Sequence, residues 1–166
     1  MKKMIMLAAV IVTAGLSAQA QKAKVSERVT ERFNQEFSQA SEITWTKVGG
    51  LFLSRFYDNQ DYCLAYFDAD GKMLLSGKQI SFDHAPTAVK KATQRIRNAS
   101  EKTDDLLRVA GIYELTGDEG TSYFINLDSE SLNMSLIAYG DGSSKVLSKT
   151  KINKVRNANP VMITKQ

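Results

Sequence analysis

The chain has 166 residues and a formal net charge of +4, and 43% of its residues are hydrophobic. This length fits one domain, or one domain made of two similar halves, with room for a core of its own. Cys63 is the single cysteine, which excludes an internal disulfide bond, and no basic patch with interleaved aromatic residues supports nucleic-acid binding.

The first twenty residues have the composition of a secretory signal peptide. Two lysines give a cationic start, an apolar run follows from Met4 to Leu16, and Ala18 and Ala20 stand at the small-residue positions of a cleavage site. The apolar run is shorter than the roughly 20 residues that a membrane span needs. We therefore expect cleavage after Ala20 and a mature chain of net charge +2, without a membrane anchor, in the periplasm or outside the cell.

The first half of the mature chain, about residues 25–80, predicts a helix followed by four strands. Apolar residues recur every four positions with charged residues between them, as in an amphipathic helix: Val25, Val29, Phe33 and Phe37. The period then changes from four to two, and tight-turn sequences separate short apolar segments. These segments are the predicted strands of an antiparallel meander: "ITWTKV", "LFLSRFY", "YCLAYF" and "MLLSGKQI".

The same order of patterns returns in about residues 83–150. The stretch "FDHAPTAVKKATQRIRNAS" predicts a second helix, which Asp83 can cap and in which Pro86 fits the first turn. Four more strands are predicted: "LLRVAGIYEL", "TSYFINL", "LNMSLIAY" and "SKVLSKT". Residues 151–166 lose the alternation, and we interpret them as a mobile basic tail or as a strand extension as far as Val155.

The two halves share the phrase A-S-E-x-T, in "QASEITW" and again in "RNASEKTDD". In both halves it stands where the predicted helix ends and the predicted sheet begins. The predicted fold class is therefore α+β, with a helix followed by about four antiparallel strands as a tandem repeat over about 25–80 and 83–150. Both helices should pack on one face of the sheet. The alternative is two chance phrases in an ordinary α+β domain.

Two residues could carry chemistry, and the sequence places neither in a catalytic motif. His84 is the one histidine, and Cys63 lies between apolar residues in "DYCLAYF". No G-x-S-x-G, H-E-x-x-H or C-x-x-C motif is present. Asp68 and Asp70 resemble the start of a calcium loop, but position twelve is Gln79 rather than a glutamate. We therefore expect no catalytic residue, no metal and no cofactor.

Aromatic side chains in the predicted strands are the remaining candidate for function. A sheet covered by helices on one face leaves its other face to water or to a partner. Tyrosine and arginine suit protein recognition, because they combine a large contact area with a polar tip. We predict Arg55, Tyr57, Tyr62 and Tyr66 as binding residues for an unidentified envelope or secreted protein. The alternative is that such tyrosines rim the core.

Three stretches carry a resemblance to a known family: "FNQEFSQASEITW", "YCLAYFDADGKML" and "HAPTAV". They resemble exported proteins of the PepSY-like, β-lactamase-inhibitor-protein-like group, and the likeness runs from about Val29 to Lys149. The resemblance implies tandem helix-plus-four-strand units and a non-enzymatic role in the envelope or outside the cell. Related folds bind and inhibit enzymes through a concave sheet, but no inhibitory residue of those proteins matches a position here.

The expected function is that of an exported, non-catalytic binding protein that recognises or inhibits a protein through an exposed sheet face. One alternative is a periplasmic small-ligand carrier, which requires an enclosed apolar pocket between helix and sheet. Another is a hydrolase that uses His84 or Cys63, which requires a second reactive group within reach.

Overall fold

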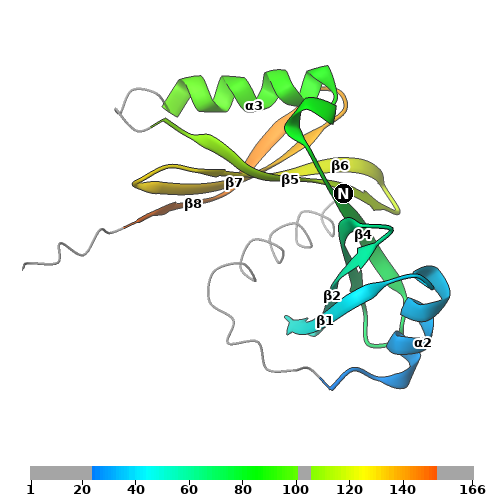
Figure 1. Cartoon of the computed structure of the whole chain (residues 1–166). Helices are drawn as coiled ribbons and strands as arrows, with labels where there is room; N and C mark the ends of the chain where they lie inside the picture. Colours follow the sequence, from blue (N-terminus) through cyan, green and yellow to red (C-terminus); the bar gives the residue numbers. More distant parts are fainter. Residues whose placement is uncertain (1–23, 101–105, 153–166) are drawn as a thin grey trace, which may run out of the picture.

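The protein is described by a computed structural model that covers residues 24–100 and 106–152, and in it eight strands form one sheet (Figure 1). Each strand pairs antiparallel with the next along the chain, so the predicted meander is confirmed. The elements are α2 (Glu27–Glu36), β1 (Ser41–Val48), β2 (Leu51–Asp58), β3 (Asp61–Phe67), β4 (Met73–Ile80), the 3-10 helix η1 (Phe82–His84), α3 (Thr87–Ser100), β5 (Arg108–Gly117), β6 (Gly120–Asp128), β7 (Leu132–Tyr139) and β8 (Ser144–Lys151). The predicted signal peptide and Val155 lie outside the described residues.

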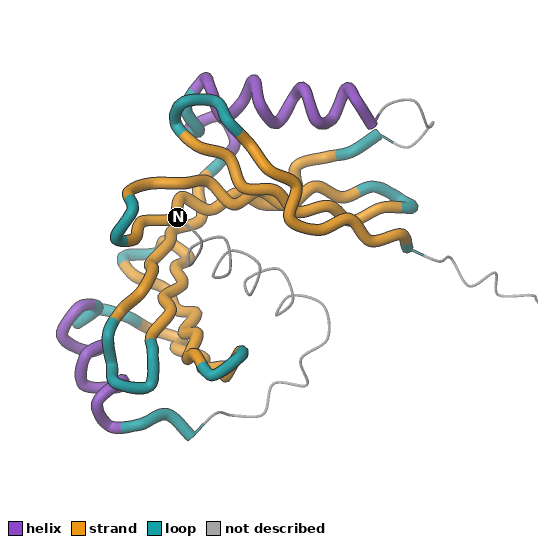
Figure 2. Tube along the Cα trace, turned by 180° about the vertical axis from the view of Figure 1, so that it is seen from behind, coloured by secondary structure: helices purple, strands orange, loops and turns teal. Residues whose placement is uncertain are grey.

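Both helices lie on the same face of the sheet, as the strand registers show. Cys63 on β3 packs under α2. It pairs with Lys78 on β4, and Lys78 pairs with Glu114 on β5, so these three side chains lie on one face of the sheet. Ile112, two residues from Glu114 on β5, packs under α3. The two halves of the sheet are turned relative to each other, with α2 and α3 on the outer side of the bend (Figures 1 and 2). Neither α2 nor α3 lies on the inner side, which we call the concave face.

The order of helix and four strands occurs twice, before and after residue 81. The first A-S-E-x-T phrase lies where α2 gives way to β1, as expected. The second begins at the end of α3 and continues into residues outside the described chain. The repeated element order is therefore an observation, whereas an origin by internal duplication stays a prediction.

An aromatic cluster holds α2 against β1–β3. Phe33 is 1% exposed, and its ring centroid lies 4.9 Å from that of Phe56, 5.2 Å from that of Trp45 and 6.2 Å from that of Phe67. The predicted helical stripe is confirmed, because Val29 is also fully buried and the flanking members of the stripe pack against this cluster. Packing of this apolar stripe, more than helix propensity, stabilises a helix as short as α2.

The second helix differs from its prediction at its start. A 3-10 helix ends at His84 and α3 begins only at Thr87, so Asp83 does not cap α3. The carbonyl of Pro86 instead accepts the first helical hydrogen bond, from the Lys90 amide at 3.0 Å. Proline at this boundary explains the break, since it disfavours the helical conformation in the residue before it. The predicted apolar face of α3 is otherwise confirmed, with Val89 and Ala92 buried over β5–β7.

A third cluster lies on the concave face, where no helix of the described residues covers the sheet. Its buried members come from five neighbouring strands: Leu53, Leu64, Tyr66, Leu75, Leu115 and Phe124. Gly77 lies at its centre on β4, and the absence of a side chain there lets Leu64 and Leu115 close over the strand. This cluster joins the two halves of the sheet through side chains as well as through the β4–β5 hydrogen bonds.

Candidate partner-binding face

The four predicted binding residues share the concave face. Arg55 and Tyr57 alternate on β2, and the register pairs Tyr57 with Tyr62. Leu53 pairs with Tyr66, which lies four residues after Tyr62 on β3 and therefore on the same side of the sheet. Because the side-chain period of a strand is two, antiparallel pairing without a bulge in β2–β3 places all four side chains together.

The four differ in exposure. Tyr57 is 38% exposed, Arg55 and Tyr62 are half-buried, and Tyr66 is only 1% exposed. Burial raises the pKa of Tyr66 to about 12, an effect that the nearby positive charge of Arg55 partly opposes. Tyr66 therefore packs within the central cluster of the concave face, whereas Arg55, Tyr57 and Tyr62 reach its surface.

A row of aromatic rings continues from these residues into the second half. The ring centroids of Tyr57 and Tyr62 lie 5.4 Å apart, those of Tyr62 and Tyr113 lie 6.5 Å apart, and those of Tyr113 and Phe124 lie 6.4 Å apart. These separations are typical of interacting aromatic pairs. The row crosses from β2 to β6, so it belongs to both halves of the sheet.

Tyr113 and Phe124 are the members of this row that the sequence prediction missed, and Gln79 lies between Tyr62 and Tyr113 on β4. Gln79 pairs with Tyr113, and Tyr113 pairs with Phe124. The alternation of β4 and β5 was visible in the sequence, but the register between these strands was not, because η1 and α3 separate them. Five of the six tyrosines share the concave face: Tyr57, Tyr62, Tyr66, Tyr113 and Tyr139.

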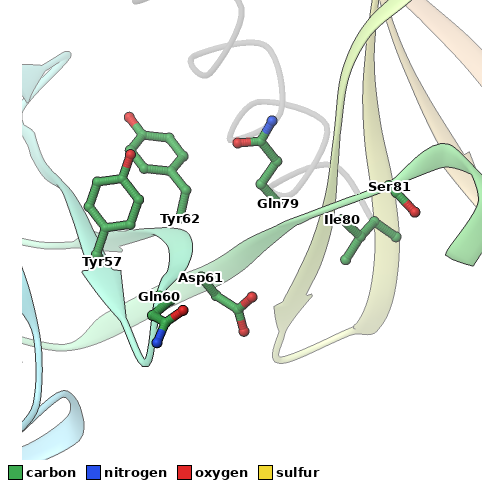
Figure 3. Close-up of a pocket in the computed structure, with 7 residues that line it drawn as sticks. All are labelled: Tyr57, Gln60, Asp61, Tyr62, Gln79, Ile80 and Ser81. Carbon is green, nitrogen blue, oxygen red and sulfur yellow. The ribbon is translucent and has the colours of Figure 1, made fainter.

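An open hollow of about 420 Å³ borders the row where the β2–β3 hairpin and the end of β4 meet (Figure 3). Its lining consists of Tyr57, Gln60, Asp61, Tyr62, Gln79, Ile80 and Ser81. Figure 3 shows Tyr57, Tyr62 and Gln79 pointing to the same side of the sheet. Positive φ angles at Asn59 (48°) and Gln60 (74°) form the tight turn that carries Gln60 to this site. An open hollow of this kind can receive a protruding side chain of a partner.

The residues considered for catalysis lie elsewhere. Cys63 is buried under α2, on the face opposite the tyrosines, and His84 is an exposed residue at the end of η1. Burial raises the pKa of the Cys63 thiol, and the carboxylates of Asp58 and Asp61 raise it further. A raised pKa keeps the thiol protonated at neutral pH, whereas nucleophilic cysteines need the thiolate.

The reactivity of Cys63 is therefore expected to be low in the folded protein. We predict that Cys63 reacts with a thiol-specific disulfide reagent at pH 8 at least tenfold more slowly in buffer than in denaturing urea, because folding removes both access and thiolate. A colorimetric assay of thiol release measures both rates. Equal rates in the two conditions would show that Cys63 is open to solvent and reactive.

The acidic turns use their carboxylates for local structure. The Asp68 carboxylate accepts hydrogen bonds from the amides of Asp70 at 3.0 Å and Lys72 at 2.8 Å. The Asp141 carboxylate accepts from the amide and the hydroxyl of Ser143, which lowers the pKa of Asp141. Among the described residues no group of three or more potential metal ligands occurs. The segments that begin at Asp68 and Asp141 are therefore tight turns that an aspartate side chain stabilises.

The fold defines a class: an α+β protein in which one bent antiparallel sheet carries two helices on its outer side. Solved structures from Bacteroides share it. A candidate periplasmic protein from Bacteroides eggerthii is 17% identical with a TM-score of 0.62, over 81% of this chain and 94% of that chain. A BLIP-like protein from Bacteroides fragilis is 14% identical with a TM-score of 0.55, over 89% of this chain and 96% of that chain.

A DUF2874 family protein from Bacteroides ovatus is 14% identical with a TM-score of 0.61, over 81% of this chain and 93% of that chain. No family model matches the chain, and no curated protein matches it. These similarities show a BLIP-like fold, as the resemblance implied, while the PepSY-like part of that resemblance stays a prediction. Among the described helices, none has the length and apolar character needed to cross a membrane.

Proposed function

We propose that this chain is an exported, non-catalytic protein that recognises a protein partner through the concave face of its sheet. The observation that carries the proposal is the aromatic row from Tyr57 to Phe124, which crosses both halves of the sheet on the face opposite α2 and α3. Tyrosine is enriched in protein interfaces because one rigid side chain supplies contact area and a hydrogen bond together.

The partial exposure of the row suits a role in binding. Tyr57 and Tyr139 are each 38% exposed, and both lie on the concave face. The hollow beside Tyr62 is open, and its polar rim of Gln60 and Gln79 offers hydrogen bonds to an incoming segment. Recognition sites in proteins combine such an aromatic centre with a polar rim.

Export and the absence of catalysis belong to the same proposal. The signal-peptide composition of residues 1–20 supports export, and so does the similarity in fold to a candidate periplasmic protein. Cys63 is buried on β3 under α2, whereas His84 is exposed in η1, and this placement in different elements supports a non-catalytic role. The small-ligand carrier gains no support from the hollow at Tyr62, which is open and lies at the strand ends rather than between helix and sheet.

Site-specific photo-crosslinking in exporting cells tests the proposal. We expect a benzophenone amino acid at Tyr57 or Tyr139 to give discrete adducts with one partner, because both positions lie exposed on the concave face. The same group at Glu31 on α2 or Lys91 on α3, which are exposed on the helix layer, should give none. Mass spectrometry of the adducts identifies the partner.

The matching binding measurement uses the double variant Tyr57→Ala/Tyr62→Ala. Loss of two aromatic side chains of the row is expected to weaken binding of the crosslinked partner at least tenfold, because a few aromatic residues carry most of the energy of an interface. Calorimetry measures the affinity, and a thermal melt confirms that the variant is folded. Adducts that form equally from the helix layer, or an unchanged affinity, would contradict the proposal.

A further inference from the structure

Arg55 is a half-buried cation on the concave face that forms no ion pair with another described residue. The ion pairs that the described residues make with one another join other groups: Arg32–Glu36, Lys72–Asp118, Lys78–Asp61 and Arg108–Asp128. A charge that is partly removed from water without an ion-pair partner loses hydration free energy. Binding of an opposite charge from a partner protein can offset this loss.

The register explains why the acids of the β2–β3 hairpin do not pair with Arg55. Asp58 and Asp61 are the nearest acids along the hairpin, but their alternation with Tyr57 and Tyr62 turns them to the helix side. There Asp61 pairs with Lys78 at 2.8 Å. Among the described strand residues that have register partners, one acid lies on the concave face, namely Asp128. Its carboxylate forms an ion pair with Arg108 at 3.6 Å.

The surroundings of Arg55 suit recognition of a carboxylate. Across the strands it lies opposite Leu64, so Tyr62 and Tyr66 are its diagonal neighbours on β3. Its positive charge is near enough to lower the pKa of both Tyr66 and Tyr113, against the effect of their burial, so the cation acts on the aromatic side chains of this face. Arginine offers a planar fork of donors that matches a carboxylate with two parallel hydrogen bonds.

A second cation of the concave face, Lys145, adds to this charge pattern. Phe124 pairs with Ile137, and Ile137 pairs with Lys145 at the far end of the same cross-strand row. Lys145 is exposed, and no ion pair joins it to another described residue. An aromatic and aliphatic strip bordered by Arg55 and Lys145 is complementary to a segment that carries acidic residues next to apolar ones.

We propose that the partner presents an acidic protein segment, in which an aspartate or glutamate beside aromatic or aliphatic residues forms a two-pronged ion pair with Arg55. This inference rests on the proposed function, because it names the chemistry of the partner that the concave face recognises.

Peptide display tests the inference without knowledge of the partner. Random twelve-residue peptides on phage are selected in parallel on the mature protein and on Arg55→Met, which keeps the length of the side chain and removes its charge. We expect peptides from the wild-type selection to be enriched in aspartate and glutamate next to apolar residues, and those from the variant selection to lack this enrichment.

Soluble peptides then give the affinities. A wild-type-selected peptide should lose at least tenfold in affinity on Arg55→Met and on exchange of its own glutamate for glutamine. Arg28→Met is the matched control, since Arg28 is exposed on α2, and it should bind as the wild type does. Arg55→Lys should bind with intermediate affinity, because it keeps the charge but not the fork.

The peptide experiments distinguish failure of this inference from failure of the proposed function. Peptides that require Tyr57 but show no acidic preference would overturn the inference and leave the proposed function standing. Peptides indifferent to both Tyr57→Ala and Arg55→Met, or no selected peptides at all, would overturn both.

Discussion

Replacement of Phe33 by alanine is expected to lower the free energy of unfolding by about 3–5 kcal/mol. Phe33 is 1% exposed and contacts four other aromatic rings, those of Phe37, Trp45, Phe56 and Phe67. These contacts hold α2 on the sheet, and such a short helix is not stable without them. Urea unfolding followed by far-UV circular dichroism and by the fluorescence of Trp45 measures the loss.

Asn34→Ala is the control for this experiment. Asn34 is exposed on the same helix, so its replacement should change the free energy of unfolding by less than about 0.5 kcal/mol. A loss below about 1 kcal/mol for Phe33→Ala would show that α2 contributes little to the stability of the sheet.

Gly77→Val is expected to destabilise the protein by about 1–3 kcal/mol through overpacking. A Cβ atom at position 77 would lie 2.5 Å from Cδ2 of Leu115 and 3.2 Å from the carbonyl oxygen of Glu114. Leu115 is 2% exposed, so its side chain has little room to move. The clash falls on the cluster that joins the two halves of the sheet.

Gly111→Val provides a matched control on the neighbouring strand. A Cβ atom there would meet only Cε2 of Tyr113 at 3.8 Å, which is an ordinary contact. Urea unfolding should show a lower free energy of unfolding for Gly77→Val than for Gly111→Val. Amide hydrogen exchange at the β4–β5 pairing should be faster in Gly77→Val alone. Equal stability of the two variants would mean that the concave cluster tolerates added volume.

The local elements could be predicted because their signals are local. The four-residue spacing of Val29 and Phe33 marks the buried side of α2, since side chains four apart in a helix lie on one face. The alternation of β2 and β3, together with the short turn between them, set a register that brought Arg55, Tyr57 and Tyr62 together. The prediction was wrong only in detail at α3, where Asp83 belongs to the preceding 3-10 helix.

The sequence by itself therefore determined the elements, their antiparallel order within each half and the residues that share a face within one hairpin, because period and turn length act over a few residues. Only the tertiary structure decided that the halves form one sheet, that Tyr113 and Phe124 extend the row of Tyr57 and Tyr62, and that Tyr66 is buried. The physical reason is that β4 and β5 meet across a long connection. Their register depends on the close packing of Leu64 and Leu115 over Gly77, which no local pattern encodes.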